Sequence, residues 1–176
     1  MPAIRNFYYS ATSFVGKKII ALVERGIGIY VKEPPVLDAK NFLWTQQFEE
    51  SYLRIKSEYL SVAGKHLTQD IAEISFEQQK VVEKRKWNFF PLYVYGNPVD
   101  ENLKLCPQTA ILLNHIPNMT TAFFSTLTPG TEVKEHRGAF KGYLRFHLGI
   151  DIPVDYENCG ITILKKNYHW KNGKSL

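Results

Sequence analysis

The sequence has no run of eighteen apolar residues, only two cysteines and no strong excess of either charge. Without such a run, we expect no transmembrane helix. The cysteines, Cys106 and Cys159, are too few for a disulfide framework and lack the spacing of a zinc site. They predict a reduced, cytoplasmic protein, and a single bridge between them is the alternative. The first residues also lack the apolar region and cleavage site of a signal peptide.

Charge of both signs is present, with 22 lysine and arginine residues against 17 aspartate and glutamate residues. The formal net charge of +5 indicates a mildly basic surface. Such a surface attracts anionic substrates or lipid headgroups, or is an ordinary solvated face. The sequence holds neither paired Cys/His fingers nor an aromatic RNP motif, so we expect no nucleic-acid partner.

The chain has ample material for a hydrophobic core, because 44% of its 176 residues are hydrophobic and 14% are aromatic. Its length fits one structural domain. The pattern of apolar residues changes at Trp87: helical periodicity precedes it, and short runs of aromatic and β-branched residues follow it. We therefore interpret residues 1–86 as an N-terminal helical segment that braces the domain, and residues 87–176 as its core.

Residues 12–30 form the first predicted helix. They are apolar with Lys17, Lys18 and Arg25 interspersed, which is typical of an amphipathic helix. Such a helix covers its own domain or makes peripheral contact with a membrane surface. Pro34-Pro35 then indicates an extended connector.

Residues 46–62 predict a second helix, because their large apolar residues recur at steps of four, three and four. This stripe consists of Phe48, Tyr52, Ile55 and Tyr59. Ser75 and Gln78 are spaced like a capping box for a further helix through Lys84. We expect both helices to brace a sheet rather than to carry chemistry.

Short aromatic and β-branched runs separated by turn residues follow Trp87. Strands are predicted near residues 87–94, 120–128, 131–137, 142–152, 159–166 and 167–170. Pro107 suits the first turn of a short helix over 107–115, and Thr128-Pro129-Gly130-Thr131 suits a turn between strands. This pattern predicts a mainly β fold, either a β-sandwich or a jelly roll (the double-stranded β-helix of cupins), with the N-terminal helices packed outside.

Residues 143–152 are the most informative predicted strand. Strand alternation puts one apolar set on a single face, namely Leu144, Phe146, Leu148, Ile150 and Ile152. Arg145 and His147 lie together on the opposite face. Because the planar fork of arginine engages both oxygens of a carboxylate, this pair suggests an anion site inside the sandwich. A solvated face is the alternative.

The last ten residues, 167–176, read as a strand, an Asn172-Gly173 hairpin turn and the start of a returning strand. So short an arm leaves backbone groups on its partner unpaired, so we expect a fragment or a lost final strand. The histidines do not by themselves predict iron. A non-haem iron site takes two histidines and one carboxylate. The His-x-Asp motif that supplies such ligands would need Asp two residues after His136, where the sequence has Gly138.

A series of short motifs nevertheless runs from Trp87 to Leu176, over about half of the chain. In order, they are Trp87-Asn88-Phe89-Phe90, Cys106-Pro107-Gln108-Thr109, Ile116-Pro117, Ala122-Phe123-Phe124-Ser125, Pro129-Gly130-Thr131, His136-Arg137-Gly138, Leu144-Arg145-Phe146-His147-Leu148-Gly149, Cys159-Gly160-Ile161, and Trp170 with Gly173-Lys174. This order and spacing resembles the aspartyl/asparaginyl β-hydroxylase domain, whose members are iron(II)- and 2-oxoglutarate-dependent dioxygenases. Bacterial lipid A hydroxylases share that domain.

The resemblance implies roles by position. His136 matches the first iron ligand of the family. Three residues match positions that hold 2-oxoglutarate, namely Ser125, Arg145 and His147. Trp87 matches an aromatic residue that borders this cosubstrate, with an ordinary core tryptophan as the alternative. Gly138 agrees with the β-hydroxylase branch, which uses two histidines and no carboxylate, whereas the lipid-hydroxylating branch often has Asp there.

The implied reaction is hydroxylation of an unactivated C–H bond with Fe(II), 2-oxoglutarate and O2. The implied substrate is an Asp or Asn side chain of a peptide or protein, in preference to a lipid. After Gly173-Lys174 the family has a second iron-binding His and an Arg that pairs with 2-oxoglutarate, and neither occurs in this sequence. The resemblance therefore implies a C-terminally truncated chain, inactive as given or part of a longer protein. The alternatives are lipid acyl-chain hydroxylation at a membrane, a non-catalytic binding module and a non-functional copy.

Overall fold

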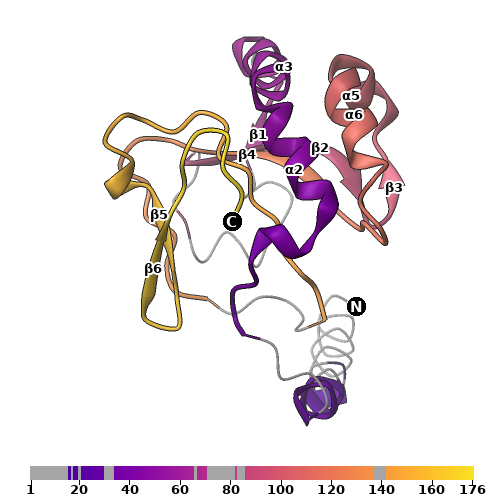
Figure 1. The fold of residues 1–176 in the computed structure, drawn as a ribbon, viewed down its shortest axis with the longest axis vertical. Helices are drawn as coiled ribbons and strands as arrows, with labels where there is room; N and C mark the ends of the chain where they lie inside the picture. The colour runs from indigo at the N-terminus through magenta and orange to yellow at the C-terminus, as the bar shows by residue number, and fades with distance from the viewer. Residues whose placement is uncertain are drawn as a thin grey trace, which may run out of the picture. The chain divides into compact units, whose positions relative to one another are not determined.

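The computed structural model describes residues 16, 18–19, 21–29, 34–65, 67–70, 82, 86–136 and 142–176 (Figure 1). It divides into two units, Met1–Leu37 with Arg137–Arg145, and Asp38–His136 with Phe146–Leu176. In the first unit, the described residues between 16 and 29 are helical, as the amphipathic pattern predicts. No helix within the described ranges combines the length and apolar character that crossing a bilayer requires.

The second unit begins with a short 3-10 helix and two α-helices, η1 (Ala39–Asn41), α2 (Leu43–Glu50) and α3 (Tyr52–Gly64). The single helix predicted over 46–62 is thus divided at Ser51, whose φ of −89° and ψ of 4° leave the helical region. The predicted stripe is confirmed, because Phe48, Ile55 and Tyr59 are buried and Tyr52 is half-buried. The expected capping box at Ser75 and the helix through Lys84 lie outside the described residues.

The main sheet is antiparallel and is organised around one long strand. Its strands are β1 (Gln69–Asp70), β2 (Trp87–Val94), β3 (Asn97–Pro98) and β4 (Ala122–Leu127). β2 pairs with each of the others, and Phe90 of β2 lies opposite Phe124 of β4. The chain between β3 and β4 holds two short helices, α5 (Asp100–Leu105) and α6 (Pro107–Leu113). The strands predicted near 87–94 and 120–128 and the helix starting at Pro107 are therefore confirmed.

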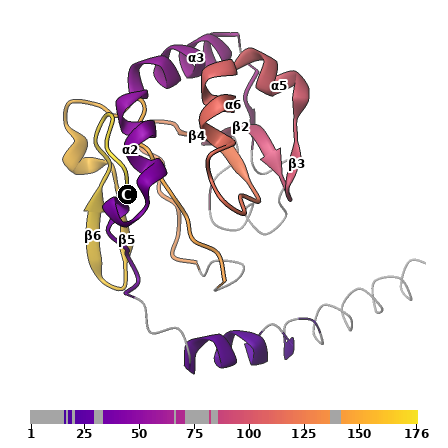
Figure 2. The ribbon, with the colours of Figure 1, turned by 45° about the vertical axis from the view of Figure 1, so that its right-hand side comes forward.

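One face of this sheet is covered by helices, as Figures 1 and 2 show for α3 and α6. Phe90 and Phe124 share a core with Ile55 of α3 and Leu113 of α6. The phenol oxygen of Tyr59 lies 3.0 Å from the hydroxyl of Thr126 in β4, which adds a polar contact at the edge of this core. The helices brace the sheet, as the stripe predicted. The opposite face carries a smaller cluster of Val82, Phe89, Trp87 and Val133.

The turn after β4 is the predicted one, but the two strands predicted beyond it are wrong. The amide of Thr131 donates to Thr128 O at 3.1 Å, and Gly130 has a φ of +72°. Residues 131–136 contain no strand, and 142–152 contributes only isolated bridges at Leu148 and Gly149. The expected apolar face is right in part: three alternate residues pack against the core, namely Phe146, Leu148 and Ile150, whereas Leu144 is 67% exposed.

The C-terminal region has a hairpin of β5 (Gly160–Ile163) and β6 (Lys166–His169), preceded by a 3-10 helix, η3 (Tyr156–Asn158). Its turn residues Leu164 and Lys165 both have positive φ, 46° and 68°, which is typical of a tight type I′ turn. The break between these two predicted strands therefore falls at 164–165 rather than at 166–167.

The last three residues return from a turn at Gly173, but they pair with a distant segment rather than with β6. Gly173 has a φ of +69°, and a Cβ added there would lie 3.1 Å from the Tyr52 ring, so glycine is strongly favoured. His147 and Leu176 exchange two backbone hydrogen bonds of 2.8 Å, and the Gly149 amide donates to Lys174 O at 3.0 Å. The short arm, expected to pair with the strand before it and to leave part of that strand unpaired, instead closes against residues 147–149, and 142–152 contributes isolated bridges only.

Candidate functional site

Trp87 and Ser125 lie together on the sheet face that the helices leave uncovered. The register places Ser125 of β4 opposite Phe89 of β2, two residues from Trp87, so the three side chains share one face. The indole N–H of Trp87 donates to Ser125 Oγ at 2.8 Å. Because an indole nitrogen can only donate, Ser125 Oγ is the acceptor, and its own proton points to another partner. The exposed Ser125 therefore presents an O–H donor.

The surroundings of this hydroxyl are apolar. The rings of Phe89 and Phe123 meet edge to face with their centroids 6.0 Å apart. Phe89 is buried, whereas Phe123 is 42% exposed and Leu127 is 38% exposed. A polar donor at the margin of an apolar surface is a common arrangement in sites for small ligands, where a few polar groups fix the orientation of the ligand.

His147 is half-buried and is held by the C-terminal segment. Its ring stacks on Trp170 with a centroid distance of 5.9 Å and an interplanar angle of 25°. The indole N–H of Trp170 donates to His147 Nδ1 at 3.1 Å. An Nδ1 that accepts carries no proton, so the neutral ring has its proton on Nε2. His147 is therefore a hydrogen-bond donor at Nε2, the polarity that an anionic ligand requires.

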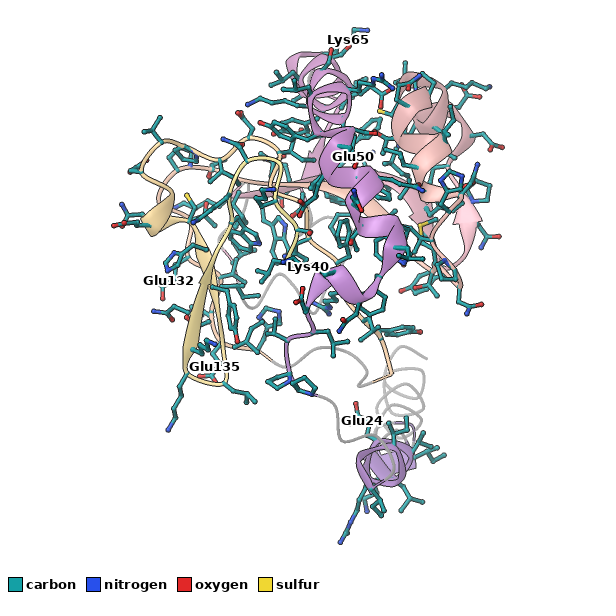
Figure 3. The ribbon with its side chains drawn as sticks, in the orientation of Figure 1. Glu24, Lys40, Glu50, Lys65, Glu132 and Glu135 are labelled. Atoms are coloured by element: carbon teal, nitrogen blue, oxygen red, sulfur yellow. The ribbon has the colours of Figure 1, made fainter. Side chains whose placement is uncertain are left out.

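His136 has the opposite polarity. Its Nδ1 lies 2.8 Å from Lys134 O, and because a carbonyl oxygen only accepts, Nδ1 carries the proton. Nε2 then keeps its lone pair, as in histidines that bind metals while the other ring nitrogen donates to a carbonyl. His136 is exposed, and the same segment carries two further exposed ionisable side chains, Glu132 and Glu135, which Figure 3 labels.

Arg145 is exposed and belongs to the first unit, where it ends the segment Arg137–Arg145. His147 follows two residues later in the second unit. The two residues lie in different units, and the anion site suggested for Arg145 and His147 stays a prediction. Of the sequence-predicted site residues, the structure joins Trp87 to Ser125 directly, and it gives His136, Arg145 and His147 three separate settings.

Sequence reasoning missed the role of Trp170. It stands in the series of motifs, but its contact with His147 spans 23 positions of the chain and no local pattern reveals it. The signal in the sequence that could have indicated such a contact is chemical: a tryptophan that becomes buried on folding requires an acceptor for its N–H.

The described residues supply an incomplete set of metal ligands. Among them, no three His, Cys, Asp or Glu side chains gather closely enough to hold a metal ion. Both cysteines are free thiols. Cys106 is fully buried, and burial together with the charge of Glu58 raises the pKa of its thiol to about 11. A thiol with so high a pKa is neither a ready metal ligand nor a nucleophile. His136 is thus the one sequence-predicted ligand, and its tautomer suits that role.

Comparison with known proteins places all the sequence-predicted site residues within one matched family domain. The chain matches the family described as aspartyl/asparaginyl β-hydroxylase over residues 49–176. It is 33% identical over 144 residues to an ornithine lipid ester-linked acyl 2-hydroxylase of Rhizobium tropici, which covers 81% of this chain and 51% of that protein. It is also 33% identical over 105 residues to the human aspartyl/asparaginyl β-hydroxylase, which covers 57% of this chain and 14% of that protein. The chain thus spans about half the length of the first relative and far less of the second.

Proposed function

Since this chain belongs to the aspartyl/asparaginyl β-hydroxylase family, we propose that it is a hydroxylase that depends on Fe(II), 2-oxoglutarate and O2. The observation that carries the proposal is the hydrogen-bond polarity of Ser125 and His147. Trp87 leaves the Ser125 hydroxyl as a donor, and Trp170 leaves His147 Nε2 as a donor. Two donors with fixed polarity suit a cosubstrate whose two carboxylates offer only acceptors.

In this proposal the side chains bind and orient the cosubstrate. The Ser125 hydroxyl and His147 Nε2–H donate to carboxylate oxygens, and Arg145 pairs with a carboxylate through its guanidinium fork. Such charge-assisted bonds are roughly twice as strong as neutral ones. Trp87 has a double role, because it borders the cosubstrate and keeps the Ser125 proton free for it. Phe89 and Phe123 keep water from one side of the bound molecule.

His136 would hold Fe(II) through Nε2, and the remaining ligands would come from outside the described residues. When bound, the iron supplies the oxygen chemistry that no amino-acid side chain provides. The bond from Nδ1 to Lys134 O keeps the ring in the ligating tautomer before the metal arrives.

We also propose a fold and a location for the protein. The main sheet and the β5–β6 hairpin belong to a jelly roll. The free thiols reflect a cytoplasmic location.

Two substrate classes are compatible with the family. The longer of the two similarities, over 81% of this chain, is to a protein named as a lipid acyl hydroxylase, and it supports a lipid acyl chain. An Asp or Asn side chain of a peptide is the second candidate, supported by the shorter similarity to the human enzyme and by Gly138. The preference of the sequence for a peptide substrate stays a prediction, and the longer shared region is the reason for proposing the lipid acyl chain beside it.

The proposed reaction is tested by succinate release from 2-oxoglutarate with the purified whole protein, Fe(II) and either an ornithine lipid or an Asp-containing peptide. We expect His136→Ala to lose at least about a hundredfold in rate, because it removes a metal ligand. His115→Ala is the matched control, since His115 is also exposed and also has one hydrogen bond through Nδ1. The proposal fails if His136→Ala and His115→Ala turn over alike, or if EDTA leaves the rate unchanged.

A further inference from the structure

The helix of the first unit exposes a continuous apolar stripe. Its members recur at the spacing of one helix face, and they are Ile19, Leu22, Val23 and Ile29. Leu22 is 72% exposed and Ile29 is 65% exposed, while Ile19 and Val23 are 57% and 47% exposed. Single exposed leucines need no explanation on a protein surface, but a row of four on one helix face indicates a binding surface.

Positive charge borders this stripe. Lys18 and Arg25 are seven residues apart, so they lie in one row along the helix. Lys18 is four residues before Leu22, and Arg25 is four before Ile29, so this cationic row runs beside the most exposed apolar row. Glu24, labelled in Figure 3, lies on a different side of the helix by its spacing and is only 7% exposed.

We propose that this helix docks on the surface of an anionic lipid bilayer. In this arrangement the helix lies in the interface, with Leu22 and Ile29 at the level of the acyl chains. Arg25 and Lys18 reach the headgroup phosphates, as basic residues at the rim of interfacial helices do. The proposal concerns binding alone and does not depend on the reaction proposed above.

The charge pattern favours a bilayer over a second copy of the chain. A second copy would bring the same cations to the seam and no anion in that row, whereas anionic headgroups attract each cation. The whole chain adds to this attraction, because its formal net charge is +5. An anionic membrane surface therefore matches both the apolar and the charged part of the helix.

The test is co-sedimentation of the whole protein with vesicles of phosphatidylcholine mixed with phosphatidylglycerol, and with vesicles of phosphatidylcholine alone. We expect binding to the mixed vesicles, reduced about tenfold or more by Leu22→Glu, because burial of that side chain is lost. Arg25→Gln should weaken binding to the mixed vesicles about fivefold and change little with neutral vesicles. Glutamate and glutamine are good helix formers, so circular dichroism should show the helix retained.

Leu53→Glu is the matched control, because Leu53 of α3 is 73% exposed, almost the same fraction as Leu22. It should bind vesicles as the wild type does. Absence of the wild-type protein from the vesicle pellet would overturn the proposal, as would equal losses in the two variants. Concentration-dependent oligomers that Leu22→Glu abolishes, without vesicle binding, would assign the stripe to a second copy and also overturn it.

Discussion

His147 and His136 carry their ring protons on different nitrogens, and this difference decides what each can bind. The indole N–H of Trp170 donates to Nδ1 of His147, whereas Nδ1–H of His136 donates to Lys134 O. One histidine therefore offers an N–H and the other a lone pair. In the proposed site, the first is suited to a carboxylate and the second to a metal ion, so two residues of the same type have separate roles.

Replacing Trp170 by Phe should release the tautomer of His147. The ring and its stacking remain, but Nδ1 loses its donor. A lost hydrogen bond is worth about 0.5–1.5 kcal/mol, so we expect about two- to tenfold weaker binding of 2-oxoglutarate. Nitrogen-15 NMR of the wild type should show a bare Nδ1 and a protonated Nε2, with both tautomers in the variant.

Trp44→Phe is the control, since it makes the same substitution at a tryptophan that packs on Phe146 and leaves the His147 contact intact. It should keep the wild-type tautomer and affinity. A protonated Nδ1 in the wild-type protein would contradict the assigned tautomer.

Cys106 should resist alkylation far beyond neutral pH. Burial, with the charge of Glu58, raises the pKa of its thiol from 9.0 to about 11, so the thiol stays protonated at pH values below that. The stability from this neutral thiol is present below its unfolded pKa and is lost as the pH rises through about 11. At pH 8, two pKa units leave roughly a hundredfold less thiolate to react with iodoacetamide.

Cys159 is the internal reference for this measurement, because it is half-buried and free. Mass spectrometry should find it labelled in the folded protein, with Cys106 labelled only after unfolding in urea. Equal rates for the two thiols in the folded protein would contradict the burial of Cys106.

At the scale of elements, Glu49 of α2 ties the C-terminal arm to the rest of the unit. Its carboxylate accepts from the Ser175 amide at 2.8 Å and from the Ser175 hydroxyl, and it pairs with Lys174 Nζ at 3.1 Å. Figure 2 shows the C-terminus beside α2. Because Leu176 pairs with His147 through the backbone, this contact also helps to fix the segment that carries His147.

Glu49→Ala should destabilise the protein by about 1–2 kcal/mol in urea unfolding, most of it from the bonds to Ser175 because the Lys174 pair is exposed. Glu50→Ala on the same helix is the control. Glu50 is exposed and accepts one bond from Gln46, so its loss should cost no more than about 0.5 kcal/mol. Equal losses for the two variants would contradict the proposed role of Glu49.

The Glu49 effect should depend on pH. Burial raises the pKa of Glu49, but the bonds from Ser175 and the charge of Lys174 outweigh it, so the pKa lies below its usual 4.5. The contribution of a carboxyl with a lowered pKa is fully present above its unfolded value and is lost as the pH falls through the folded value. The stability difference between wild type and Glu49→Ala should therefore shrink in acid.

The elements that local signals specify were predictable, and those that depend on distant partners were not. Pro107 identifies the start of α6, and alternating apolar residues identify β2 and β4. Residues 142–152 look like a strand because their apolar residues alternate. Their backbone partners, Lys174 and Leu176, lie at the far end of the chain. This pairing forms two isolated bridges instead of a regular strand.

At the scale of the whole molecule, the described second unit carries the braced sheet, the hairpin and the C-terminal arm. The family match begins within α2 and continues through all of them. The resemblance to the family was therefore enough to predict the candidate residues, including Ser125 and His147, but not their hydrogen-bond partners. The hydrogen bonds from Trp87 and Trp170 that fix the proton positions required three-dimensional structure, because they join residues 38 and 23 positions apart.

The most direct test of the account is calorimetric titration of the whole protein with 2-oxoglutarate, comparing Ser125→Ala with wild type. Loss of a hydrogen bond to a charged group costs about 1.5–3 kcal/mol, so the account predicts roughly tenfold to hundredfold weaker binding. Ser57→Ala, at an exposed serine of α3, should bind as the wild type does. Wild-type affinity in Ser125→Ala would contradict the claim that this hydroxyl holds the cosubstrate, and absence of binding by the wild type would contradict the site as a whole.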